Sequence, residues 1–248
     1  MTANNGKLSE EEARKIVDQL YAQLLARGEQ RVTRGRFMSE LAEGKISRES
    51  IKTFWLNWHN FVVEVNNFAQ CAYQRHLGFF LQHLDLMTPF ADKVADELIH
   101  PKAPGHLLMV WKQGEVFGLT RDQMVNYPTL PECRGLLDWL RGLLYEGTMA
   151  EFWSSFAAEE YVGHWAQAFR LGLKKMGYTD QQLVYFKAHE EADLQEHEGV
   201  MGHGEFNRAV LRRLLTTGNV SFRPGYSLEY CTTTSIDLYA LLVDRCVV

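Results

Sequence analysis

Residues 185–197 read YFKAHEEADLQEH, a stretch that combines a helical pattern with a row of metal-binding side chains. Because an α-helix has 3.6 residues per turn, positions four residues apart drift by only about 40° around its axis. His189, Asp193 and His197 therefore project from one face over two turns. Two imidazoles and a carboxylate in one row suit a first-row divalent metal with nitrogen and oxygen ligands, notably iron. The same row is also compatible with a solvated, charged helix face.

The segments on both sides of this stretch also predict helices. Capping boxes, in which a Ser or Thr is followed three residues later by Glu or Gln, mark helix starts at Ser9, Thr148 and Thr179. We expect Thr148 to open one long helix that ends near residue 177, and Thr179 to open the helix that carries His189. A further start is expected at Thr88, because proline at the first helical position is favourable. Without a strand pair, a repeat or a polar linker, the sequence predicts an all-α fold, a single-domain helical bundle over residues 1–248.

The composition excludes several classes of protein. The chain has 248 residues, of which 46% are hydrophobic, and this supplies a sizeable core and excludes a disordered chain. Four cysteines without a CxxC pair exclude a disulfide-rich secreted scaffold. A net charge of −5 without a basic stripe argues against a nucleic-acid partner. No run of about 18 apolar residues and no signal-peptide core are visible, so we expect a cytoplasmic protein without a membrane partner.

Two further segments carry candidate ligands. Glu159 and Glu160 lie among apolar residues in SSFAAEEYVGHW, where a carboxylate on the inner face needs a partner. Of the two, Glu160 is expected to face solvent. Glu97, near the end of FADKVADELI, and His106, at the start of the next helix, can meet across a short loop. With the row described above, these segments supply three carboxylates and three imidazoles, which is enough for two metal ions. The candidate ligands are Glu97, His106, Glu159, His189, Asp193 and His197.

The order of these residues resembles a known superfamily. A glutamate, a short gap, a histidine, a second glutamate and then His-x₃-Asp-x₃-His is similar to the pattern of the haem-oxygenase-like diiron oxidases and oxygenases. These share their helical fold with thiaminase II and pyrroloquinoline-quinone synthase. The segments HLLMVWKQGEVFGL, AAEEYVGHW and WHNFVVEVNNFAQ also resemble that group, and the second assigns the ligand to Glu159 rather than Glu160. The resemblance extends from about Ile46 to the C-terminus and implies the haem oxygenase fold.

The resemblance also implies an activity. It predicts a non-haem diiron enzyme that binds two Fe(II) ions at the six candidate ligands and uses O₂ as co-substrate; an external electron donor is compatible with this activity. Its substrate would be a small amino-acid-like or fatty-acid-like metabolite that undergoes oxidative decarboxylation or C–C cleavage, desaturation or N-oxygenation. A homodimer is compatible with it. His100, in Glu97-Leu-Ile-His100, remains a rival ligand, and Glu64 is a candidate for an extra carboxylate, although a role in the core is favoured for it.

Two other interpretations stay open. A metal-free enzyme, similar to thiaminase II or pyrroloquinoline-quinone synthase, would need a catalytic cysteine on the ligand-like helices or a pocket ringed by arginine and tyrosine, and neither pattern is clear. A non-catalytic helical interaction module would carry its acids on the surface and have no pocket. The remaining histidines are expected to have no ligand role. They are His59, His76, His83, His164 and His203.

Overall fold

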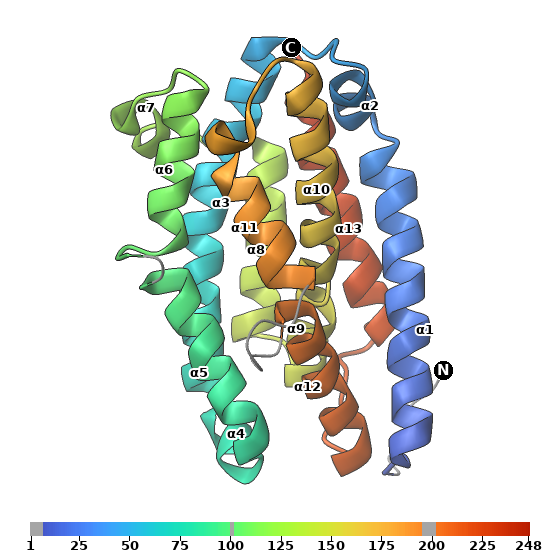
Figure 1. Cartoon of the computed structure of the whole chain (residues 1–248). Helices are drawn as coiled ribbons and strands as arrows, with labels where there is room; N and C mark the ends of the chain where they lie inside the picture. The colour runs from blue at the N-terminus through green and yellow to red at the C-terminus, as the bar shows by residue number, and fades with distance from the viewer. Residues whose placement is uncertain (1–6, 100–101, 195–201) are drawn as a thin grey trace.

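The computed structural model describes residues 7–99, 102–194 and 202–248, and for Asp96 and residues 191–194 it describes the backbone alone. In these ranges the chain forms helices joined by turns, without strands, as predicted (Figure 1). The helices are α1 (Glu10–Gly28), the π-helical η1 (Glu29–Thr33), α2 (Arg36–Ala42), α3 (Arg48–Arg75), α4 (Leu77–Gln82), α5 (Leu84–Leu98), α6 (His106–Val116), α7 (Arg121–Val125), α8 (Pro131–Tyr145), α9 (Met149–Phe156), α10 (Glu159–Lys175), the 3₁₀ turn η2 (Asp180–Gln182), α11 (Val184–Leu194), α12 (His203–Thr217) and α13 (Leu228–Arg245).

The core of the bundle is aromatic, and the long helix α3 runs through it. Ser47 caps α3 by accepting a hydrogen bond from the Ser50 backbone N–H. The Phe54 ring lies 5.6 Å from Trp58, and Trp58 lies 5.0 Å from Trp165 of α10. Each such side chain stabilises the fold by about 1.5–3 kcal/mol through its burial. This cluster fixes α3 against α10, and both helices contribute residues to the site described below.

The prediction that Thr88 starts a helix is wrong. Pro89 lies inside α5, which begins at Leu84. Proline removes one backbone hydrogen bond from a helix interior. Leu86 and Phe90, on either side of it, are almost fully buried in the core. Their packing holds the turn in helical form, so tertiary contacts override the local signal.

The expected long helix from Thr148 is divided in two. The capping box at Thr148 starts α9 as predicted, but α9 ends at Phe156 and α10 begins at Glu159. Between them the backbone tightens, because the Ala158 N–H bonds to the Ser155 carbonyl and the Glu160 N–H to the Ala157 carbonyl, each three residues back. The break places Glu159 in the first turn of α10, where the helix dipole favours a carboxylate.

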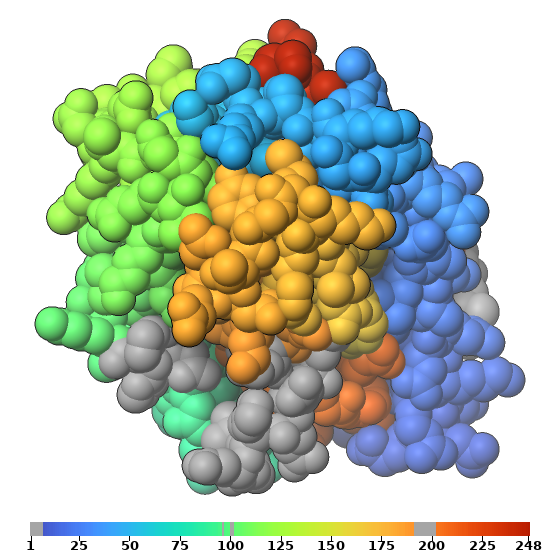
Figure 2. Space-filling model, turned by 45° about the horizontal axis from the view of Figure 1, so that its top comes forward, coloured from blue at the N-terminus to red at the C-terminus, as the bar shows by residue number. Residues whose placement is uncertain are grey.

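The expected start at Thr179 is also displaced. Its capping box with Gln182 is present, but it closes only the short turn η2, and α11 begins at Val184. Helix α11 (orange in Figure 2) packs along α10 (gold) and comes near the surface beside the C-terminal half of α10. This packing directs the inner face of α11 toward α6 and α10.

Across the described ranges, no helix is both long enough and apolar enough to span a membrane.

Candidate functional site

Glu97 and His106 meet where α5 ends and α6 begins. The Glu97 Oε2 and His106 Nδ1 atoms are 3.0 Å apart, and both side chains are largely buried. Gly105 precedes α6 with φ 63° and ψ −136°, a conformation that glycine adopts far more readily than other residues. From α3, the amide of Asn66, oriented to satisfy its hydrogen bonds, donates to Glu97 Oε2 at 2.9 Å. The contact expected across the short loop is therefore present.

The carboxylate of Glu97 stays ionised despite its burial. Burial alone would raise its pKa, but the charge and hydrogen bond of His106, followed by the charges of His203 and His189, outweigh it and lower the pKa to about 2. Three imidazoles thus surround one buried anion. A carboxylate held in this state can serve as an oxygen ligand for a cation.

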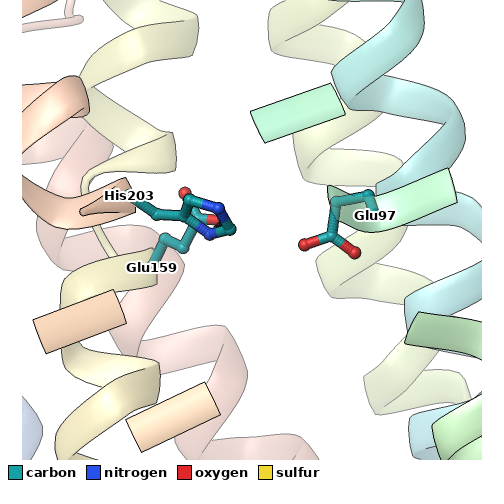
Figure 3. A group of neighbouring side chains, drawn as sticks. All are labelled: Glu97, Glu159 and His203. Atoms are coloured by element: carbon teal, nitrogen blue, oxygen red, sulfur yellow. Dashed lines mark ion pairs between the residues drawn. The ribbon is translucent and has the colours of Figure 1, made fainter. Parts of the chain in front are cut away.

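Glu159 faces Glu97 from the opposite side of the interior, together with His203 from the start of α12 (Figure 3). Its Oε1 atom lies 3.7 Å from His203 Nδ1. Its Oε2 atom accepts a hydrogen bond of 2.8 Å from Asn207 Nδ2 and pairs with the ammonium group of Lys93. One donor atom each of Glu97, Glu159 and His203 lie within 4.8 Å of one another, a spacing that a single metal ion can bridge.

His189 joins this group from α11. Its Nδ1 lies 3.0 Å from the Tyr185 carbonyl oxygen, and because a carbonyl oxygen only accepts hydrogen bonds, Nδ1 carries a proton. Its ring centroid is 4.8 Å from that of His106. The Tyr185 hydroxyl accepts a hydrogen bond of 2.6 Å from Trp58 Nε1, which anchors this turn of α11 to α3.

Four of the six predicted ligands come together in this region: Glu97, His106, Glu159 and His189. The side chains of Asp193 and His197, and the rival His100, lie outside the described residues. His203 was expected to have no ligand role, but it is only 4% exposed and contributes to the donor group. Its place in the sequence, just after the predicted ligand helix, is the one signal that points to it.

Two other expectations need correction or refinement. Glu160 does not face solvent, because it is largely buried and forms a two-pronged ion pair with Arg208 at 2.7 Å. Glu64 is held by Arg134 and Arg141, whose contacts, against the opposing effect of burial, keep its pKa below the usual range. It is an ion-paired residue between α3 and α8 and lies outside the donor group found among the described residues.

A cavity of about 100 Å³ adjoins the donor group. Glu97, Glu159 and His189 form part of its wall, and the rest is mostly apolar. Among the apolar lining residues are Val62, Val65, Leu136, Leu140, Val162 and Ile236. None of the four cysteines, all of which lie in the described ranges, is among its lining residues. The arrangement brings two carboxylates and one imidazole to a mostly apolar concave space, the kind of site that small ligands occupy in proteins.

Comparison with known proteins was made by sequence and by structure. No family model and no curated protein matches the sequence. Among solved structures, a domain of unknown function from Shewanella denitrificans, described as having a heme oxygenase-like fold, matches with a TM-score of 0.64 and 16% identity, over 96% of this chain and 92% of that chain. This chain has a haem oxygenase-like fold. The all-α fold class predicted from the sequence and the haem oxygenase fold that the resemblance implied are confirmed.

Other proteins that share the haem oxygenase-like fold are TenA homologues. One from Pseudomonas syringae pathovar tomato matches with a TM-score of 0.68 and 14% identity, over 93% of this chain and 92% of that chain. A protein described as a TenA family transcription regulator, from a Silicibacter species, matches with a TM-score of 0.62 and 14% identity, over 92% and 96%. At such identities the likeness concerns the fold alone.

Proposed function

We propose that this protein is a non-haem iron enzyme that uses O₂ to oxidise a small, largely apolar molecule. One observation carries the proposal: carboxylate and imidazole donors from α5, α6, α10, α11 and α12 converge beside an apolar cavity. The sequence pattern adds Asp193 and His197, which follow His189 at intervals of four residues. The full proposed set for two Fe(II) ions is Glu97, His106, Glu159, His189, Asp193 and His197, joined by His203.

The donor chemistry fits iron. Imidazole nitrogen and carboxylate oxygen together suit Fe(II), whereas an oxygen-only site would suit magnesium or calcium. One donor atom each of Glu97, Glu159 and His203 lie within 4.8 Å of one another, a spacing compatible with ligands of one ion. When bound, iron would supply the activation of O₂ that amino-acid side chains cannot provide.

The protein's own residues would prepare the site for this chemistry. The hydrogen bond from His189 to the Tyr185 carbonyl fixes the tautomer in which Nε2 can coordinate. Asn66 and Asn207 each donate to one site carboxylate and so orient it. The mostly apolar cavity wall would limit the access of water and hold the substrate beside the donors.

The test is iron binding followed by O₂ consumption. We expect protein reconstituted with Fe(II) under anaerobic conditions to retain iron after gel filtration, and to consume O₂ when given its substrate from a panel of small acids and amino acids. Glu97→Gln should lower both iron content and O₂ uptake by at least tenfold, because it removes an anionic ligand. Glu115→Gln, at an exposed position on α6, is the matched control. Wild-type protein that retains no iron would refute the proposal.

A metal-free, thiaminase II-like enzyme is the second candidate. The structural comparison favours it, because two of the matching structures are TenA proteins, the group that includes thiaminase II. The ion pair between Lys93 and Glu159 also favours it, because it balances one site carboxylate without a metal. The cysteines argue against this candidate, which needs a reactive catalytic thiol. Burial raises the pKa of Cys133, Cys231 and Cys246 to about 12, which keeps them as unreactive thiols. Hydrolysis of thiamine in the presence of a metal chelator would identify this candidate.

A further inference from the structure

Lys93 is a buried cation inside the donor group. It lies on α5, one helical turn before Glu97, and its side chain is 2% exposed. Its ammonium nitrogen pairs with Glu159 Oε2 and lies 5.0 Å from the centre of the Phe156 ring. A buried ammonium group is costly unless it is paired with an opposite charge. Lys93 and Glu159 therefore hold each other in place.

The two oxygens of Glu159 have different surroundings. A carboxylate oxygen offers two lone-pair directions. At Oε2 both are in use, one by Lys93 and the other by Asn207. Oε1 instead faces His203, whose Nδ1 lies 3.7 Å away. Only Oε1 is thus positioned to bind a metal ion, and Glu159 cannot bind with both oxygens until Lys93 or Asn207 moves.

We propose that Lys93 takes the place of one cation beside Glu159 and thereby sets the affinity of this site for a second metal ion. The inference rests on the proposed function, because it assumes that the donor group holds metal. The ammonium charge of Lys93 repels a divalent ion placed nearby. Its hydrogen bond to Glu159 Oε2 also blocks the oxygen that a second ion would need. Lys93 thereby acts on metal occupancy through Glu159, as a positioning residue.

Metal stoichiometry tests this directly. Metal-free full-length protein would be titrated with Mn(II), which stays divalent during the experiment, and free Mn(II) would be followed by its electron paramagnetic resonance signal. Wild-type protein should bind one ion tightly. Lys93→Met removes both the charge and the hydrogen bond, and should increase affinity for the second ion by at least tenfold. Lys93→Gln removes the charge but keeps a donor, and should give a smaller increase.

Two further variants separate a site effect from a general one. Lys93→Arg keeps the charge and should bind like the wild type. Lys112→Met, at an exposed position on α6, is the matched control and should also bind like the wild type. Metal-free Lys93→Met should melt at a lower temperature than the wild type, because Glu159 loses its cation, and Mn(II) should raise its melting temperature more.

The possible results distinguish the inference from the function on which it rests. Equal, tight binding of two ions by the wild type and by both neutral variants would overturn the role of Lys93 while leaving the metal site intact. Binding of no ion by any variant would overturn the proposed function itself. If Lys93→Met does not fold, Lys93→Gln decides, because unchanged second-site affinity in that folded variant contradicts the charge argument.

Discussion

Replacing Gly105 with alanine should disturb the site through the backbone that joins its two halves. Gly105 has a φ of 63°, and a Cβ added there would lie 2.1 Å from the carbonyl oxygen of Glu97. It would also lie 2.5 Å from the carbonyl carbon of the same residue. These atoms are backbone and cannot rotate away. The end of α5 and the start of α6 must therefore separate, and these carry Glu97 and His106.

The size of the effect has two parts. A non-glycine residue in such a conformation costs about 1–3 kcal/mol. Overpacking against fixed atoms adds a further ~1–3 kcal/mol. Gly118 provides a control, because its φ is 81° but a Cβ there meets nothing within 4 Å. Gly118→Ala should show only the conformational cost, so the two variants should differ by about 1–3 kcal/mol in the free energy of unfolding.

Urea denaturation of the metal-free proteins measures this difference, and Mn(II) titration measures its consequence for the site. Gly105→Ala should lose more stability than Gly118→Ala and should bind Mn(II) at least tenfold more weakly than the wild type. Gly118→Ala should bind like the wild type. If the two variants lose equal stability and bind Mn(II) equally well, the argument that Gly105 sets the contact between Glu97 and His106 is refuted.

Two more predictions concern the cavity and acid stability. Leu140→Trp should fill the cavity from α8 and reduce substrate-dependent O₂ consumption at least tenfold while iron content stays unchanged; normal turnover would show that substrate binds elsewhere. Burial, assisted by the charge of Arg75, lowers the pKa of His76 to about 4, so the folded protein keeps this residue neutral. Its contribution to stability is therefore complete above the unfolded pKa of about 6.5 and falls by up to ~3 kcal/mol as pH drops to about 4. His76→Gln should flatten this dependence in urea denaturation, whereas His164→Gln at an exposed position should not.

The helices that the sequence predicted correctly are those with a local signal. The capping boxes at Ser9 and Thr148 both start helices, because their hydrogen bonds span only three residues. Where prediction failed, distant contacts decided. Pro89 stays within α5 because Leu86 and Phe90 pack into the core, and no pattern in that segment reveals their partners.

The residues of the site also fall into those that a local signal predicts and those that depend on distant contacts. The contact between Glu97 and His106 could be predicted from the sequence, because the short loop between them keeps the two residues close in space. His203 could not, because its approach to Glu159 depends on how α12 packs against α10 and α11. Lys93 carries a local signal, because it lies four residues before Glu97 and so on the same helical face. A basic residue at that spacing from a candidate ligand belongs in the charge count of a predicted metal site.

That charge count explains why two functions fit one geometry. Glu97 and Glu159 bring two negative charges into a buried space, and burial requires that each be balanced. The charges and the hydrogen bond of the neighbouring histidines offset the burial of Glu97, and Lys93 pairs with Glu159, so each carboxylate has a partner other than a metal ion. A metal ion must then displace the ammonium group or bind beside it. Which of these occurs depends on how firmly Glu159 and the Phe156 ring hold Lys93. Measuring metal affinity with and without the charge at position 93 therefore tests both the proposed metal site and the proposed effect of Lys93 on its occupancy.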